Sequence, residues 1–233
     1  YGQELEPETH AVCLASMLLK TVESDPGRDL SKNIKLGSTL SDDKLANDKF
    51  HYCVSNPPFG KKWEQDQTAV VREHQEKGCE GRFGPKLPRV SDGSMLFLLH
   101  LLSKLEAPER GGGRAAIVLS GSPLFNGNAG QGESEIRRYL LEEDVVEAII
   151  ALPTDLFYNT GIQTYVWLLT NRKDAARQGK VQLIVSDENL IGTCRKSLRA
   201  GRLYPDVGER MARVHAGFGE ITRVSFQIRS LEL

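Results

Sequence analysis

Residues 50–60 read FHYCVSNPPFG, an apolar run that ends in Asn-Pro-Pro-Phe. The run before Asn56 has the composition of a β-strand, and prolines are rarely tolerated inside a strand, so this strand is expected to end at Ser55. An amide, two residues with a fixed backbone and an aromatic ring then follow one another directly. This arrangement is more specific than an ordinary turn, and it raises the question of what a strand end would hold with these groups.

Strands and helices alternate on both sides of this stretch. The alternation predicts an open, mainly parallel α/β sheet, in which ligands bind beyond the carboxyl ends of the strands. Residues 60–92 carry charges of both signs with little periodicity and are predicted to be a long loop. The predicted strands are 1–4, 33–37, 50–55, the run after the glycines at 111–113, 145–153, 164–172, 180–187 and 221–228, and the predicted helices are 7–20, 91–105 and 132–144.

Composition excludes several classes of protein. Hydrophobic residues make up 39% of the 233 residues, which is enough for the core of one large domain or two small ones. No run approaches the roughly 18 apolar residues of a membrane span, and no signal peptide is visible. The four cysteines and five histidines are scattered, so neither a metal site nor a disulfide framework is expected, and a reduced, cytoplasmic chain is predicted. The net charge of −1 means that any nucleic-acid contact must be local.

The Asn-Pro-Pro-Phe segment suits a flat substrate that bears an amino group. The side-chain carbonyl of Asn56 and the backbone carbonyl of Pro57 can each accept a hydrogen bond from one amine. Accepting both would draw the nitrogen towards tetrahedral geometry and free its lone pair for attack. Pro57 and Pro58 fix the backbone, and Phe59 offers a face for stacking. The alternative is a strand end followed by a proline turn and a core phenylalanine, and the four residues alone do not decide between the two.

The wider sequence is similar to a known family. SNPPFG after an apolar strand resembles the catalytic motif of amino-group methyltransferases that use S-adenosylmethionine. The stretches YGQELEPETHAVC, RFGPKLPRVSDGSMLFLLHLLSKL and AIVLSGSPLFNGNAGQGESEIRRYLLEEDVVEAIIALPTDLFYNTGIQTYVWLLTNR resemble the modification subunit of type I restriction-modification systems. Those subunits are adenine-N6 DNA methyltransferases with a Rossmann-like fold. The likeness runs from Tyr1 to about Asp187.

The resemblance implies roles for particular residues. It makes Asn56, Pro57, Pro58 and Phe59 the catalytic motif, with S-adenosylmethionine as the cofactor. Glu4, at the end of its strand, would take the ribose hydroxyls of the cofactor, and Ser38 and Thr39 would contact its adenine. Phe59 and Phe157 would stack on the two faces of the target base. No metal is implied.

The resemblance also implies partners and domain boundaries. The partners would be DNA and the specificity and restriction subunits of a type I complex. Residues 1–187 would form the catalytic domain, and residues 188–233 a partly irregular extension of it. The family's first strand and glycine-rich cofactor loop precede the position of Tyr1, so the 233 residues alone are expected to be inactive.

That first strand would lie between the strands at 1–4 and 50–55. Its absence predicts two free strand edges. The edges could close on each other, residues 1–40 could pack elsewhere, or another chain could pair with them, for example in a homodimer. We expect pairing with another chain.

Two other functions remain open at this point. Relatives with Asn-Pro-Pro-aromatic motifs methylate RNA or the glutamine of a protein. A truncated chain could also serve as a non-catalytic module that docks other subunits. Near the motif, Lys61, Lys62 and Arg82 are candidate contacts to DNA phosphates, with a solvated charged loop as the alternative.

Overall fold

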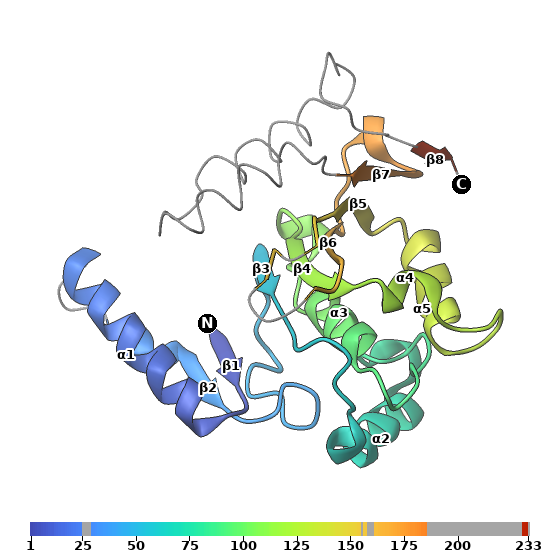
Figure 1. Cartoon of the computed structure of the whole chain (residues 1–233). Coiled ribbons are helices and arrows are strands. Elements are labelled where there is room, and N and C mark those ends of the chain that lie inside the picture. The colour runs from blue at the N-terminus through green and yellow to red at the C-terminus, as the bar shows by residue number, and fades with distance from the viewer. Residues whose placement is uncertain (25–28, 155, 158–160, 186–229, 233) are drawn as a thin grey trace.

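The computed structural model describes residues 1–24, 29–154, 156–157, 161–185 and 230–232 (Figure 1). The described strands form two sheets, and no strand of one sheet pairs with a strand of the other. The smaller sheet pairs β1 and β2 in parallel, and the larger has the order β3-β4-β6-β5-β7-β8. The strands are β1 (Gly2–Glu4), β2 (Ile34–Leu36), β3 (Tyr52–Ser55), β4 (Arg114–Ser120), β5 (Val146–Ala151), β6 (Thr164–Thr170), β7 (Lys180–Val185) and β8 (Ser230–Glu232). The helices are α1 (Pro7–Ser24), α2 (Gln67–Lys77), α3 (Ser94–Ser103), α4 (Ser122–Phe125) and α5 (Gly132–Glu142).

The larger sheet is mixed but mainly parallel. Strands β3, β4, β5 and β7 run in the same direction, whereas β6 runs antiparallel to both of its neighbours and β8 antiparallel to β7. The predicted open α/β sheet is therefore confirmed, with the reversed β6 as a detail that periodicity does not reveal. Among the described residues, no helix is long and apolar enough to cross a membrane.

Helix α3 forms the centre of the core beside β3 and β4 (Figure 1). It buries Met95, Leu96, Leu98 and Leu99 almost completely, as its apolar periodicity predicts. The helix begins just after Asp92, whose Oδ1 accepts hydrogen bonds from the backbone N–H and the hydroxyl of Ser94. This side chain satisfies one of the free N–H groups of the first turn. The helix is thus fixed at its start, close to the carboxyl ends of the strands.

The prediction of a loop over residues 60–92 is wrong. The segment contains α2 and three-residue 3-10 turns on either side of it. Sequence patterning misses α2 because Val70 is its only fully buried residue and the helix has no apolar stripe. Tertiary contacts hold the segment instead: Trp63 is buried, with its indole N–H donating to the carbonyl of Arg89, and a ring nitrogen of His74 lies 2.7 Å from the carbonyl of Phe83.

The two sheets meet without closing on each other. β1 pairs with β2, β3 pairs with β4, and no described strand joins β1 to β3. The alternative in which the two edges pair directly is therefore not adopted. On β3, Tyr52 and Val54 are 81% and 84% exposed, while Cys53 between them packs against the core. Among the described strands, β3 is therefore an edge of the large sheet, and it exposes two apolar side chains.

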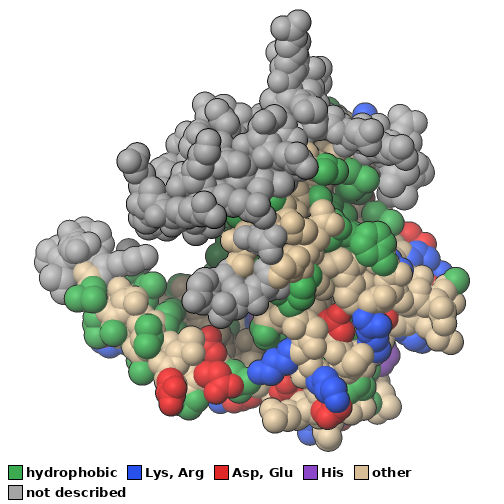
Figure 2. Space-filling view, viewed as in Figure 1, with side chains coloured by type: hydrophobic (Ala, Val, Ile, Leu, Met, Phe, Trp, Pro, Cys, Tyr) green, Lys and Arg blue, Asp and Glu red, His purple; other side chains and the backbone are tan. Residues whose placement is uncertain are grey.

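The predicted extension at 188–233 lies outside the described residues except for β8, and so does the predicted strand at 221–228. On the face shown in Figure 2, Lys and Arg side chains are interspersed with Asp and Glu. This mixture agrees with the net charge of −1. Among the described residues on that face, no broad positive surface is formed.

The exposed edge of β3 generates a prediction about association. A strand edge with unpaired N–H and C=O groups and exposed apolar side chains is a template for pairing with another chain. The 233-residue chain should therefore form dimers or larger species in size-exclusion chromatography with light scattering. Val54→Lys should shift it towards monomer, whereas Phe125→Lys, an equally apolar exposed position away from this edge, should not. A wild-type chain that is monomeric at all concentrations would contradict the prediction.

Candidate functional site

One cavity of about 600 Å³ lies between the small sheet and the edge of the large one. Its wall is built from strand ends, as expected for an α/β sheet. Strand β1 contributes its last residue, Glu4, the chain after β2 contributes Ser38 and Thr39, and the chain after β3 contributes Asn56, Pro57 and Pro58. Six of the eight residues singled out from the sequence therefore line the same cavity, although they come from three segments far apart in the chain.

The Asn-Pro-Pro segment is fixed at its centre and open at its start. Pro57 is buried, whereas Asn56 and Pro58 are exposed. The exposed side chain of Asn56 lines the cavity, where its amide can reach a ligand. The chain that follows is anchored, because Gly93 donates to the carbonyl of Lys61 at 3.0 Å and Trp63 donates to the carbonyl of Val90 at 3.1 Å.

Phe59 and Phe157 lie together beside this segment. Their ring centroids are 6.2 Å apart and the rings are nearly perpendicular, at 81°, in an edge-to-face contact. Both are half-buried, and Phe157 also packs against the small apolar cluster of Ile150, Leu152 and Ile184. The two aromatic rings proposed from the sequence are thus brought into contact by the fold, about 100 residues apart in the chain.

On the opposite side of the cavity, Glu4 and Ser38 differ in how far their side chains are engaged. A carboxylate oxygen of Glu4 accepts a hydrogen bond from the backbone N–H of Glu6 at 3.0 Å. The hydroxyl of Ser38 donates to Asp66 at 2.7 Å and lies within reach of the N–H groups of Leu40 and Ser41. Ser38 therefore shapes the turn after β2. The carboxylate of Glu4 can still accept further hydrogen bonds from a ligand.

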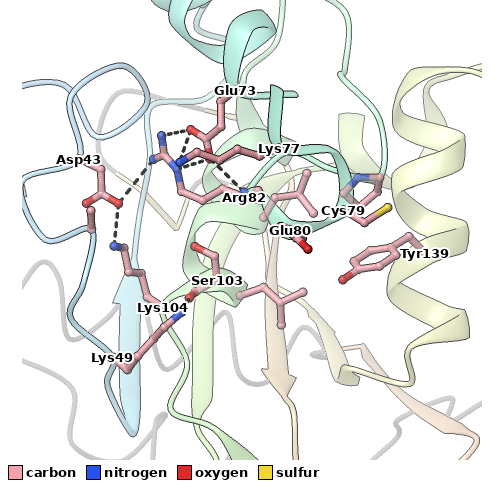
Figure 3. Close-up of a pocket in the computed structure, with 15 residues that line it drawn as sticks. Asp43, Lys49, Glu73, Lys77, Cys79, Glu80, Arg82, Ser103, Lys104 and Tyr139 are labelled. Atoms are coloured by element: carbon pink, nitrogen blue, oxygen red, sulfur yellow. Dashed lines mark hydrogen bonds and ion pairs between the residues drawn. The ribbon is translucent and has the colours of Figure 1, made fainter. Parts of the chain in front are cut away.

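A buried network of charged residues stands behind this turn (Figure 3). Lys104 pairs with Asp43 at 2.6 Å, and Arg82 pairs with Glu73 at 2.6 Å and approaches Asp43 at 3.8 Å. The four side chains are only 7–15% exposed. Two positive and two negative charges balance one another, which is the condition under which buried charges are tolerated. Sequence reasoning missed this network.

His100 completes the network from helix α3. An Arg82 Nη1 atom lies 3.1 Å from His100 Nδ1, and because a guanidinium can only donate, Nδ1 accepts. Burial, reinforced by the positive charge of Arg82, lowers the pKa of His100 to about 4. Burial opposes ionisation of Asp43 and Glu73 as well, but hydrogen bonds from Lys104 and Arg82 respectively outweigh it, so both carboxyl pKa values are lowered. His100 is therefore neutral at pH 7.

The expectation that Arg82 contacts DNA phosphate does not agree with this geometry. Its guanidinium is 15% exposed and fully engaged by neighbours within the protein. Lys61 and Lys62 are exposed, and both line the cavity. The charged network has one signal in the sequence. His100 stands inside the leucine-rich run SMLFLLHLLS, and a buried histidine requires a hydrogen-bond partner.

The described residues contain no group of His, Cys, Asp and Glu arranged to hold a metal ion. A second cavity, of about 460 Å³, lies on the far side of the charged network (Figure 3). Asp43 and Lys104 line both cavities. The network therefore forms the wall between them.

Comparison with known proteins places the chain in a family. The model of the N-6 DNA methylase family matches residues 1–209, and the chain belongs to this family. In fold alone, the chain is also similar to a solved structure from Listeria monocytogenes described as a putative class I S-adenosylmethionine-dependent methyltransferase, with a TM-score of 0.51 and 15% identity, covering 82% of this chain and 52% of that one.

Particular relatives are type I restriction enzyme methylase subunits. The chain is 27% identical over 82% of its length to the MjaIX subunit of Methanocaldococcus jannaschii and 31% identical over 72% to the EcoKI subunit of Escherichia coli, and it spans 31% and 27% of those proteins. The solved methyltransferase subunit of a type I restriction-modification system from Streptococcus thermophilus superimposes with a TM-score of 0.71 and 27% identity, covering 95% of this chain and 42% of that one. The chain thus corresponds to less than half of each relative.

The lowered pKa of His100 predicts how stability depends on pH. A histidine with a pKa of about 4 in the folded state and an ordinary value near 6.5 when unfolded binds fewer protons in the folded state between these values. The free energy of unfolding should therefore fall as pH drops from about 6.5 towards 4, by at most about 1.4 kcal/mol per pH unit from this group. The stability that ionised Asp43 and Glu73 contribute is lost only at lower pH, because their carboxyl pKa values are lowered in the folded state.

Urea unfolding at several pH values between 4.5 and 7 would measure this dependence. His100→Gln should flatten it, and His10→Gln, at a histidine outside the network, serves as the control and should leave it in place. An unchanged slope in a folded His100→Gln variant would show that His100 is not the titrating group.

Proposed function

We propose that this chain is the catalytic part of an adenine-specific DNA methyltransferase, the modification subunit of a type I restriction-modification system. The observation that carries the proposal is the single cavity lined by Glu4, Ser38 and Thr39 on one side and by Asn56 to Pro58 on the other. A methyl donor and an acceptor amine must meet within bonding reach, and this cavity joins the residues proposed for each. Family membership supports the same reaction class.

The chemistry assigned to Asn56 and Pro57 is acceptance of the two N–H bonds of an adenine amino group. The buried, rigid Pro57 keeps its own carbonyl in place, and the exposed Asn56 amide supplies the second acceptor. Both acceptors become more effective as positive charge develops on the nitrogen during attack. No side-chain base is needed before the attack, because the lone pair becomes available as the amine leaves planarity.

The cavity suits S-adenosylmethionine as the methyl donor. Its volume of about 600 Å³ falls within the range of small-molecule sites, roughly 300–1,000 Å³. Glu4 retains carboxylate acceptors for the ribose hydroxyls, and the turn at Ser38 and Thr39 lines the region proposed for the adenine. The bound cofactor would supply a methyl group activated on a sulfonium. The residues of this chain hold and orient it against Asn56.

The proposed substrate, an adenine within a duplex, must leave the base stack to reach Asn56. Phe59 and Phe157 are the proposed walls for the extruded base. A base between two parallel rings needs a separation of about 7 Å, twice the van der Waals spacing. The observed rings contact each other edge to face at 6.2 Å, so the base would replace this contact as the rings turn and part. Until a base enters, the two rings pack against each other.

The proposed partners are DNA and the specificity and restriction subunits of the complex. The exposed Lys61 and Lys62, directly after the motif, are the proposed phosphate contacts, because both line the cavity beside Asn56. Methylation assays of the full-length protein on DNA, RNA and protein substrates would separate this proposal from its alternatives. Transfer to RNA or to a protein glutamine, with none to DNA, would overturn it.

The role of Asn56 gives a prediction about catalysis. In the full-length protein, Asn56→Ala should lower the rate of methyl transfer at least about a hundredfold, because a positioned acceptor at a developing charge is lost. Cofactor binding, measured by calorimetry, should stay within about threefold, since this side chain is assigned to the substrate amine and not to the cofactor. Asn47→Ala removes another exposed amide, in the loop before β3, and should have no effect. Near-normal methylation by Asn56→Ala would contradict the assignment.

The aromatic pair gives a prediction about base extrusion. Phe59→Ala or Phe157→Ala should each weaken binding or rate by about ten- to a hundredfold, because stacking is worth roughly 1–3 kcal/mol per base. Tryptophan at either position should have a much smaller effect, because it keeps the stacking surface.

The fluorescence of 2-aminopurine at the target position reports the extrusion directly, since it rises when the base leaves the stack. The control is Phe125→Ala, at an exposed phenylalanine outside the pair. If both pair variants extrude the base like the wild type, the rings do not serve as its walls.

A further inference from the structure

Arg82 reaches from the segment after α2 to the turn after β2. Its Nη1 donates to the carbonyl of Thr39 at 2.8 Å and its Nη2 to the carbonyl of Leu40 at 3.0 Å. Glu73 holds the guanidinium from the other side, with oxygens 2.6–3.1 Å from Nε and Nη2, and it also accepts the backbone N–H of Arg82. The planar fork is therefore fixed on one edge by a carboxylate and presents its remaining donors to two successive backbone carbonyls.

The same turn is held at two further points. The hydroxyls of Ser38 and Ser41 both donate to Asp66, which lies just before α2. At the far end of the loop, the ammonium of Lys104 donates to the carbonyl of Leu45 and pairs with Asp43. The loop from Ser38 to Leu45 is thus held by Asp66 just before α2, by Arg82 in the segment after α2 and by Lys104 just after α3.

Thr39 and Leu40 line the cavity proposed for the cofactor, whereas Arg82 does not. Arg82 instead lines the neighbouring cavity, where Figure 3 shows it beside Glu73 and facing Asp43. Its influence on a bound ligand must therefore pass through the backbone it holds. Loss of the Arg82 guanidinium would leave the largely buried carbonyls of Thr39 and Leu40 without these hydrogen-bond donors. The turn would then have to move for the carbonyls to reach other donors.

We propose that Arg82 is a positioning residue that sets the turn at Thr39 and Leu40 against the adenine half of the cofactor. This inference rests on the proposed function. It assigns to the charged segment after the catalytic motif a role in cofactor affinity, where the sequence suggested DNA contact. A lysine cannot replace the arginine, because an ammonium cannot donate to both carbonyls and to the carboxylate in the fixed geometry of the fork.

The test is Arg82→Lys in the full-length protein, with adenosine and methionine as separate competitors of S-adenosylmethionine. The inhibition constant of adenosine should rise about tenfold or more, as expected when a backbone position loses a charge-assisted hydrogen bond. The inhibition constant of methionine should stay within about twofold, and kcat at saturating cofactor within about threefold, because the residues that touch the reacting atoms are unchanged. Arg72→Lys makes the same chemical change at an exposed position of α2 and should alter none of these values.

Hydrogen exchange provides a readout that does not depend on activity. The amides of residues 38–45 should exchange faster in Arg82→Lys, while those of α3 should not, since its core packing is intact. Should Arg82→Lys fail to fold, Glu73→Gln replaces it. Glu73→Gln leaves the two carbonyl contacts in place but weakens the carboxylate that fixes the fork, and a smaller loss confined to adenosine is expected.

Two results would overturn the inference while leaving the proposed function intact. One is equal weakening of adenosine and methionine, which a general loss of structure would produce. The other is unchanged adenosine inhibition in a folded variant, whether or not the loop exchanges faster. A wild-type protein that binds neither S-adenosylmethionine nor adenosine would contradict the proposed function itself, and the inference with it.

Discussion

The placement of the small sheet depends on a buried set of ion pairs. Because β1 and β2 share no strand pairing with β3, the backbone ladder that normally joins neighbouring strands does not hold them in position. The loop after β2 is held instead by Arg82 and Lys104, whose charges are balanced by Glu73 and Asp43. Removing one member of such a set leaves an uncompensated buried charge, which costs far more than a surface pair contributes. The distance from Glu4 to Asn56 across the cavity rests on this network.

The site therefore combines a rigid half with a half that depends on distant contacts. The Asn-Pro-Pro segment follows β3 directly and is fixed by a buried proline and by hydrogen bonds to the start of α3. The opposing wall follows β2, and it is held by the side chains of Asp66 just before α2, Arg82 after α2 and Lys104 just after α3. Two reactants can be brought together by such an arrangement only if both walls are held, since effective alignment is lost with small displacements.

Much of this could be predicted from the sequence, and the failures have physical reasons. Strands and the leucine-rich α3 follow from periodicity, and the motif at Asn56 falls at a strand end as expected. Helix α2 was missed because its stability comes from tertiary contacts and not from an apolar stripe. Arg82 was taken for a phosphate contact because a sequence shows charge but not burial. Its partners Glu73, Thr39 and His100 come from three segments that only the fold brings together.

The order of the large sheet constrains how the chain can be completed during translation. Strand β6 lies between β4 and β5 although it follows both in the sequence, so β4 and β5 never pair with each other. A nascent chain that ends before Thr170 has emerged from the ribosome must therefore leave an edge open on each of them. Long-range pairing of this kind is slow and exposes strand edges to other chains. Chaperone binding during synthesis should consequently concentrate on chains whose length falls between the emergence of β4 and that of β6.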